Sequence, residues 1–246
     1  AAGRARLTTT DGLCLWDEAG APLRAATSTW KDAVRDELRH GALVALATQP
    51  GALRVEARFR APTADEIAHW SAASGLRTCS AAPAPVEFGA ARGAGGLYAA
   101  SGTSNEHEEL RLAMIDVENP GKVPLFVSVL SVTEARSCDA VWPGEGVRDQ
   151  ALGPGERVSV PVNVTLPARW PAERPMRDRY LFVATRTAVD LSPLATGAKL
   201  RSGSALPGVL EAAVSAVRTR GARTVHVDGG DWGVSTLDLL VSPAPR

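Results

Sequence analysis

In the first third of the chain the hydrophobic pattern changes from the period of a helix to that of a strand. Trp30, Val34 and Leu38 recur every four residues, which predicts a helix that ends at Gly41. Residues 52–60 then alternate between apolar and mostly charged side chains. This period of two predicts a half-buried strand with a charged face toward solvent.

A short second helix is predicted directly after this strand. Thr63 is followed three residues later by Glu66, which is the spacing of a capping box, and Gly75 is a suitable residue for the helix end. We therefore expect residues 1–80 to form a mixed α/β segment. Residues 81–108 are rich in Ala, Gly, Pro and Ser and are predicted to be a linker that buries little.

From residue 109 onward the pattern has a period of two and contains repeated Gly/Pro turns. A hairpin is predicted between residues 110–118 and 124–132, with Asn119-Pro120-Gly121 as its turn. Its second strand is apolar on both faces, so we expect it to be central in a sheet. Further strands are predicted at residues 157–166, 178–191 and 232–242.

An amphipathic helix interrupts these strands at residues 206–221, where the apolar side chains form one stripe. The sequence therefore predicts an α+β fold. The mixed segment at residues 1–80 would precede a mainly-β domain at residues 109–246, an immunoglobulin-like sandwich with this one C-terminal helix.

Composition narrows the possible partners. The 246 residues include 27 basic and 27 acidic side chains, so no net charge draws the chain to nucleic acid or to an anionic membrane. No apolar run approaches the ~20 residues that a membrane span needs. The three cysteines are too widely spaced for a zinc site or a disulfide framework. We expect free thiols, a cytoplasmic location, and neither metal nor cofactor.

Candidate catalytic groups are few. His40 with Cys79 or Cys138 would make a Cys–His dyad only if the fold brought the two side chains together. Trp142 and Trp170 lie beside prolines and are candidate exposed aromatics for binding a peptide or sugar, with packing in the core as the alternative. Whether the chain is an enzyme therefore stays open.

Three motifs follow one another in the second part of the chain: VWPGE at residues 141–145, LGPGE at 152–156 and VATRTAVDLS at 183–192. In this order, and with the Trp-Gly strand that follows, residues 109–243 resemble the β-sandwich region C-terminal to the peptidase domain of bacterial caspase-like proteins (metacaspases and orthocaspases). The catalytic His and Cys of that family occur in H-G and D-x-C-H-S-G contexts, which match no position here.

The resemblance implies a non-catalytic portion of a caspase-like cysteine protease. Its partner would be an upstream peptidase domain on the same or a cleaved chain, and it would act in docking, in activation or in recruiting other proteins. Arg4 and Arg6 lie in a GRAR sequence that resembles a site for basic-directed processing. The alternative is a stand-alone β-sandwich that binds a ligand or a protein.

Overall fold

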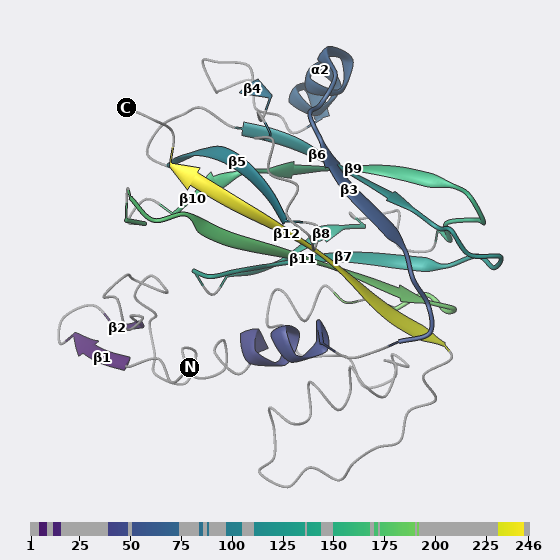
Figure 1. Ribbon diagram of the computed structural model, residues 1–246, viewed down its shortest axis with the longest axis horizontal. Helices are drawn as coiled ribbons and strands as arrows, with labels where there is room; N and C mark the ends of the chain where they lie inside the picture. The colour runs from purple at the N-terminus through teal and green to yellow at the C-terminus, as the bar shows by residue number, and fades with distance from the viewer. Residues whose placement is uncertain are drawn as a thin grey trace, which may run out of the picture.

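The computed structural model is mainly β with some α (Figure 1). It describes residues 5–8, 12–15, 39–48, 51–73, 84–85, 88, 97–104, 111–135, 137–143, 150–167, 170–171, 173–189, 191 and 231–243. In these residues two sheets pack against each other. A small hairpin of β1 (Ala5–Thr8) and β2 (Gly12–Leu15) is separate from them.

The larger sheet has six strands in the order β10-β5-β12-β11-β7-β8. Their bounds are Leu97–Ser104 for β5, Phe126–Thr133 for β7, Cys138–Trp142 for β8, Thr165–Leu166 for β10, Met176–Thr185 for β11 and Trp232–Pro243 for β12. Neighbours are antiparallel except at β5, which runs parallel to both β12 and β10.

The smaller sheet is built around β6. The strands are β3 (Glu56–Arg60), β4 (Ala84–Pro85), β6 (Arg111–Glu118) and β9 (Arg157–Asn163). β6 pairs antiparallel with β9 on one side and with β3 on the other, where β4 adds a short parallel pairing beyond the end of β3. Helix α2 (Ala64–Ala73) follows β3 and lies at the top of Figure 1.

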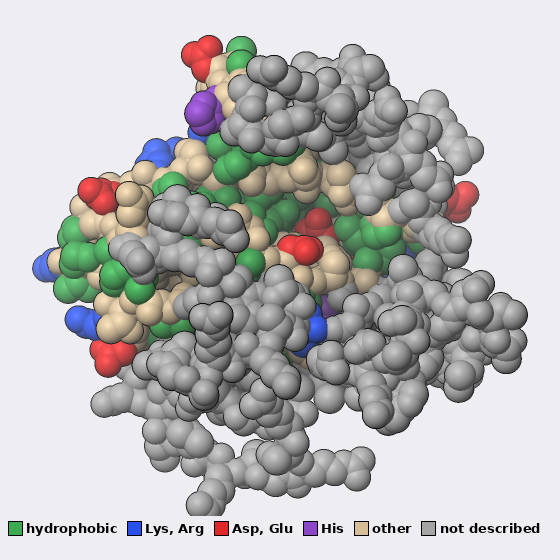
Figure 2. All heavy atoms as spheres, turned by 180° about the vertical axis from the view of Figure 1, so that it is seen from behind, with side chains coloured by type: hydrophobic (Ala, Val, Ile, Leu, Met, Phe, Trp, Pro, Cys, Tyr) green, Lys and Arg blue, Asp and Glu red, His purple; other side chains and the backbone are tan. Residues whose placement is uncertain are grey.

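One hydrophobic core fills the space between the two sheets. Ile115 of β6 and Val160 of β9, both fully buried, face Phe182 of β11 across it. The alternation expected for residues 52–60 is confirmed, because Leu53, Val55 and Phe59 point into this core while Arg54 and Glu56 are exposed. Seen from behind, acidic side chains near the middle of the molecule are bordered by hydrophobic ones (Figure 2).

A second core covers the opposite face of the larger sheet. Leu43 and Leu46, from a helix at residues 39–46, pack on Leu130 and Leu181 of the sheet. Apolar contacts on both faces explain why residues 129–132 of β7 and 180–184 of β11 are mostly apolar, and the central position expected for β7 is confirmed. The predicted helix end at Gly41 is wrong. Gly41 lies inside the helix, where packing of the leucines outweighs its low helix propensity.

The capping box predicted at the start of α2 is confirmed. The backbone N–H of Thr63 donates to Glu66 Oε2 at 2.8 Å, and the backbone N–H of Glu66 donates to Thr63 Oγ1 at 3.3 Å. Strands β9, β11 and β12 also lie where the period of two predicts them. The helix expected at residues 206–221 and the helix end expected at Gly75 lie outside the described residues.

Two expectations about connections differ from the structure. The predicted hairpin is wrong, because β6 and β7 belong to different sheets and the chain crosses between the sheets after Asn119. The predicted linker at residues 81–108 contains β4 and β5, which pair with β6 and β12. β3, from the segment at residues 1–80, also pairs with β6. Strands from all three predicted parts of the chain therefore belong to the two sheets. None of the described helices is long and apolar enough to cross a membrane.

Candidate functional site

The two candidate aromatic platforms contribute to packing. Trp170 is only 7% exposed, so of the two alternatives packing in the core holds for it. Its indole N–H donates to the Arg174 carbonyl at 2.7 Å, and the Arg174 guanidinium lies 5.0 Å from the ring centre. Trp142 is half-buried against the core between the sheets and precedes a cis peptide bond to Pro143.

His40 fastens the helix at residues 39–46 to the larger sheet. It is buried, and its Nε2 lies 3.0 Å from the carbonyl oxygen of Thr133. Because a carbonyl only accepts hydrogen bonds, this nitrogen carries the proton and donates, so it is not a base at this position. Cys138 is half-buried in β8, and Cys79 lies outside the described residues.

The remaining sequence candidates add no catalytic centre. Arg6 lies in β1, opposite Cys14 of β2, and Arg4 lies outside the described residues. Within the part of the chain that the structure describes, no three His, Cys, Asp or Glu side chains are grouped so that they could hold a metal ion. The polar groups that are brought together form two other arrangements.

The first arrangement joins the NPG turn to the LGPGE motif, and we call it the Asn119 clasp (Asn119, Gly121, Leu152, Gly153, Gly155 and Glu156). The backbone N–H of Asn119 donates to the Glu156 carbonyl at 3.1 Å, and the N–H of Gly155 donates to the Asn119 carbonyl at 2.8 Å. Gly155 has φ of +74°, a backbone conformation that favours glycine. The motif glycine is therefore needed for the turn.

The side chain of Asn119 lies at the centre of the clasp and is fully buried. Its Nδ2 donates to the carbonyls of Val123 and Leu152, both at 2.8 Å, and its Oδ1 accepts from the Gly121 N–H at 2.9 Å. An aspartate or alanine would lose the two donated bonds. Sequence reasoning identified Asn119 as a turn residue, but its contact with Leu152, 33 positions away, has no local signal.

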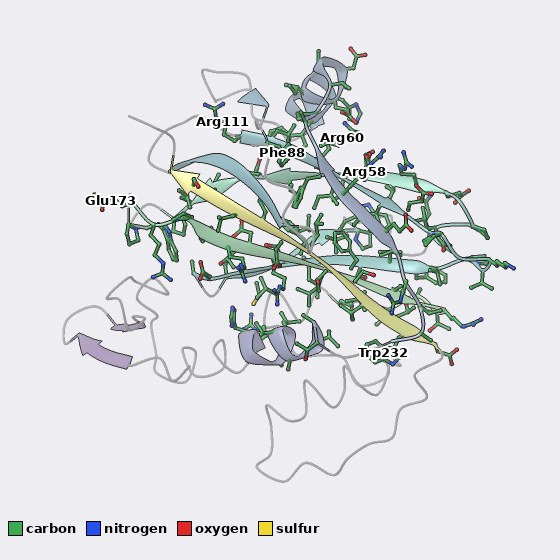
Figure 3. All side chains as sticks on the ribbon, in the orientation of Figure 1. Arg58, Arg60, Phe88, Arg111, Glu173 and Trp232 are labelled. Carbon is green, nitrogen blue, oxygen red and sulfur yellow. The ribbon has the colours of Figure 1, made fainter. Side chains whose placement is uncertain are left out.

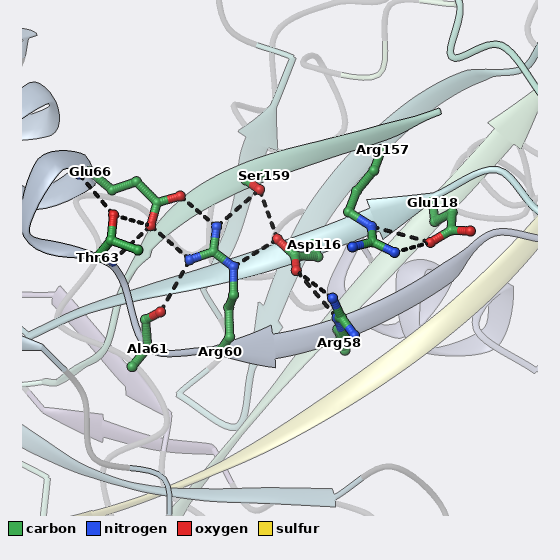
Figure 4. A network of polar contacts seen from close by, with 9 residues as sticks. All are labelled: Arg58, Arg60, Ala61, Thr63, Glu66, Asp116, Glu118, Arg157 and Ser159. Atoms are coloured by element: carbon green, nitrogen blue, oxygen red, sulfur yellow. Dashed lines mark hydrogen bonds and ion pairs between the residues drawn. The ribbon is translucent and has the colours of Figure 1, made fainter. Parts of the chain in front are cut away.

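The second arrangement is a network of arginines and carboxylates on the outer face of the smaller sheet (Figure 4). Asp116 of β6 is 5% exposed and accepts from Arg60 Nε at 2.9 Å, from Arg58 at 3.2 Å and from the Ser159 hydroxyl at 2.7 Å. Arg60 continues the network to Glu66 in the first turn of α2, with a distance of 2.7 Å. The network thereby ties α2 to three strands.

The network changes the acidity of its carboxyl groups. The hydrogen bond from Arg60 is the main cause that lowers the pKa of Glu66 to about 2. Burial by itself raises the pKa of Asp116, but hydrogen bonds from Ser159 and Arg60 outweigh it and the pKa is lowered. Stability contributed by these groups is thus present above pH ~4 and is lost as the pH falls toward 2.

Replacing Asp116 with asparagine should show how much the network stabilises the fold. Asp116→Asn removes the charge and points an amide N–H toward arginine donors, so we expect the free energy of unfolding to fall by about 2 kcal/mol at pH 7. Urea denaturation measures this loss. The matched control is Glu118→Gln, which breaks the exposed ion pair with Arg157 and should cost less than ~1 kcal/mol. Equal losses in the two variants would contradict a special role for Asp116.

Comparison with known proteins identifies no relative. No protein-family model, no curated protein and no solved structure matches this chain. Conclusions about function therefore depend on where the motif residues lie in the two sheets.

Proposed function

We propose that this chain is a non-catalytic protein-binding module whose principal partner is a caspase-like peptidase domain on the same or a cleaved chain. One observation carries the proposal: the three motifs on which the resemblance depends all contact β7 or Leu125, the residue directly before it. Leu152 of the second motif exchanges backbone hydrogen bonds with Leu125 at 2.7 and 3.0 Å. Trp142 of the first motif lies opposite Val129 in the sheet.

The third motif lies at the end of β11 and contacts the first residue of β7. Thr185 pairs with Phe126, and its hydroxyl donates to the Thr187 carbonyl at 2.7 Å. Contacts made by the motifs are thus hydrogen bonds to backbone and packing in the core. Motif residues used in this way are consistent with a structural role in a fold that we propose to be immunoglobulin-like. The proposed location is the cytoplasm.

The small number of exposed hydrophobic side chains favours a second candidate function. A docked accessory module should present an apolar patch on its surface. Among the described residues, Val44 is the only large hydrophobic side chain that is exposed, at 37%. This favours the alternative of a stand-alone β-sandwich that binds a protein or ligand through polar contacts.

The native gene product decides between the two. We would determine its intact mass and N-terminal sequence, and search the upstream reading frame for a caspase-like His/Cys pair. The proposal expects a peptidase domain that co-elutes with this chain in size-exclusion chromatography after processing. A variant with Arg4→Gln and Arg6→Gln should remain unprocessed at this end. A native start near Ala1 without an upstream peptidase domain would leave the stand-alone module as the answer.

A further inference from the structure

One acidic residue lies in the core between the sheets. In β11, Met176, Tyr180 and Phe182 point into this core, and Asp178 shares their phase. Asp178 is only 4% exposed, and its Oδ1 has no hydrogen-bond partner. Buried carboxyl groups in proteins are normally paired or hydrogen-bonded, so an unpartnered oxygen here requires an explanation.

Among the residues that the structure describes, the strands beside Asp178 present no compensating positive charge to it. In the sheet it lies between Thr133 of β7 and Leu239 of β12. The charged groups that act on it are Glu134, directly after β7, and Asp139 of β8, and both are acidic. Glu134 has partners of its own, because it accepts from the backbone N–H of Arg177 at 2.9 Å and lies 3.7 Å from Arg174.

These surroundings favour the neutral acid. Burial is the main cause that raises the pKa of Asp178 to about 8, and the charges of Glu134 and Asp139 raise it further. The neighbouring Tyr180 is also buried, and burial followed by the charge of Asp178 raises its pKa. The phenol therefore stays neutral over the same range and adds no charge beside Asp178.

Asp178 lies beside the contacts that close the connection between β7 and β8. The Thr133 N–H donates to the Ser137 carbonyl at 3.1 Å, and the Glu134 N–H donates to the Arg177 carbonyl at 3.0 Å. The Thr133 carbonyl is also the acceptor that holds His40 and its helix. A shift of the backbone at Asp178 would thus disturb the hydrogen bonds that hold the edge strand β8 and the helix at residues 39–46.

We propose that Asp178 is a proton-dependent latch, which keeps the β7–β8 end of the larger sheet closed as a neutral acid and loosens it when it ionises. The latch is independent of the identity of any partner. Between pH ~4 and 8 the folded state holds a proton that the unfolded state has released. The unfolding equilibrium constant therefore rises by up to about tenfold per pH unit across this window, and the rise stops above pH 8.

The first test follows this proton directly. The carboxyl carbon of Asp178 is observed by NMR in the wild-type chain during a titration from pH 3 to 9. A midpoint above 6 is expected, and a midpoint near 4 would overturn the proposal. This measurement needs no variant, so its result does not depend on whether a substituted chain folds.

The second test asks whether the proton controls opening. Hydrogen exchange at the Thr133 and Glu134 amides, corrected for the intrinsic rate, is compared between the wild type and Asp178→Asn. We expect protection in the wild type to fall at least tenfold from pH 6 to 9, and to stay constant in the variant. The Leu125 amide, which donates to Leu152 of the clasp, reports on the opposite end of β7. Asp65→Asn is the control variant, because Asp65 is exposed. Equal pH dependence in the wild type and Asp178→Asn would refute the latch.

Discussion

Replacing Gly233 with alanine is expected to lower the free energy of unfolding by about 3 kcal/mol or more. A Cβ atom at this position would lie 1.7 Å from the carbonyl oxygen of Leu53 and 2.6 Å from its carbonyl carbon. Both are backbone atoms, so no side-chain rotation relieves the overlap. Gly51 is equally close from the other side, since its Cβ would lie 2.3 Å from the Gly233 Cα.

This contact is where the two sheets meet along one edge. The Leu53 N–H donates to the Trp232 carbonyl at 3.2 Å, and the Val55 N–H donates to the Ser235 hydroxyl at 3.3 Å. Trp232 itself is buried at the beginning of β12 (Figure 3). Separating the strands by the width of a methyl group would break these bonds and expose the core beneath Leu53.

Urea denaturation followed by tryptophan fluorescence measures the effect. Gly41→Ala is the matched control, because a Cβ at Gly41 meets no atom within 4 Å and alanine favours the helix. That variant should be more stable by about 0.5–1 kcal/mol. Should Gly233→Ala unfold at the wild-type urea concentration, the close crossing of the two strands would not be a requirement of the fold.

The elements that sequence reasoning located are those with a strong local pattern. The period of two in residues 52–60 and 157–166 places β3 and β9, and the spacing of Thr63 and Glu66 places the start of α2. Each pattern arises because one element meets one apolar surface and solvent. Such a pattern needs no knowledge of the partner strand.

Pairing between distant segments had no such signal. Residues 110–132 read as a hairpin because two apolar strands flank turn chemistry, yet the turn bends away to meet Leu152 instead of folding β7 back on β6. β5 was expected to be part of a linker, because its sequence of small residues carries no hydrophobic alternation. Its place is set by parallel pairing with β12, more than 130 positions away.

For the candidate sites, too, local sequence patterns were informative and contacts between distant residues were not predictable. The prolines beside Trp170 left both exposure and packing open, because its burial depends on distant core residues. The unusual position of Asp178, by contrast, could have been recognised from the sequence. It occupies the inward phase of a strand between Met176 and Tyr180, where a charged residue conflicts with the pattern. Conflicts of this kind mark residues whose role is not simple packing.

Exchanging the Asn119 amide for a carboxylate should be the most damaging conservative change in the clasp. Asn119→Asp keeps the shape of the side chain, but it replaces the Nδ2 donor with an oxygen that faces the carbonyls of Val123 and Leu152. Because the site is fully buried, water cannot solvate the new charge. We expect a loss of about 3 kcal/mol at pH 7.

The loss should depend on pH in a defined direction. Burial and the two facing carbonyls would raise the pKa of the introduced carboxyl above its unfolded value of ~3.9. The folded variant then binds a proton that the unfolded chain lacks, so its stability rises as the pH falls from 7 toward 4. At pH 4 the carboxyl is neutral and can donate to one of the two carbonyls again, which recovers part of the loss.

Thermal and urea denaturation of Asn119→Asp at pH 4.5 and 7 tests both statements. Asn163→Asp is the control, because Asn163 is exposed at the end of β9 and the same chemical change there should alter stability by less than ~0.5 kcal/mol. Equal losses at the two positions would mean that the clasp does not hold the crossing between the sheets. The motif turns would then be incidental to the fold.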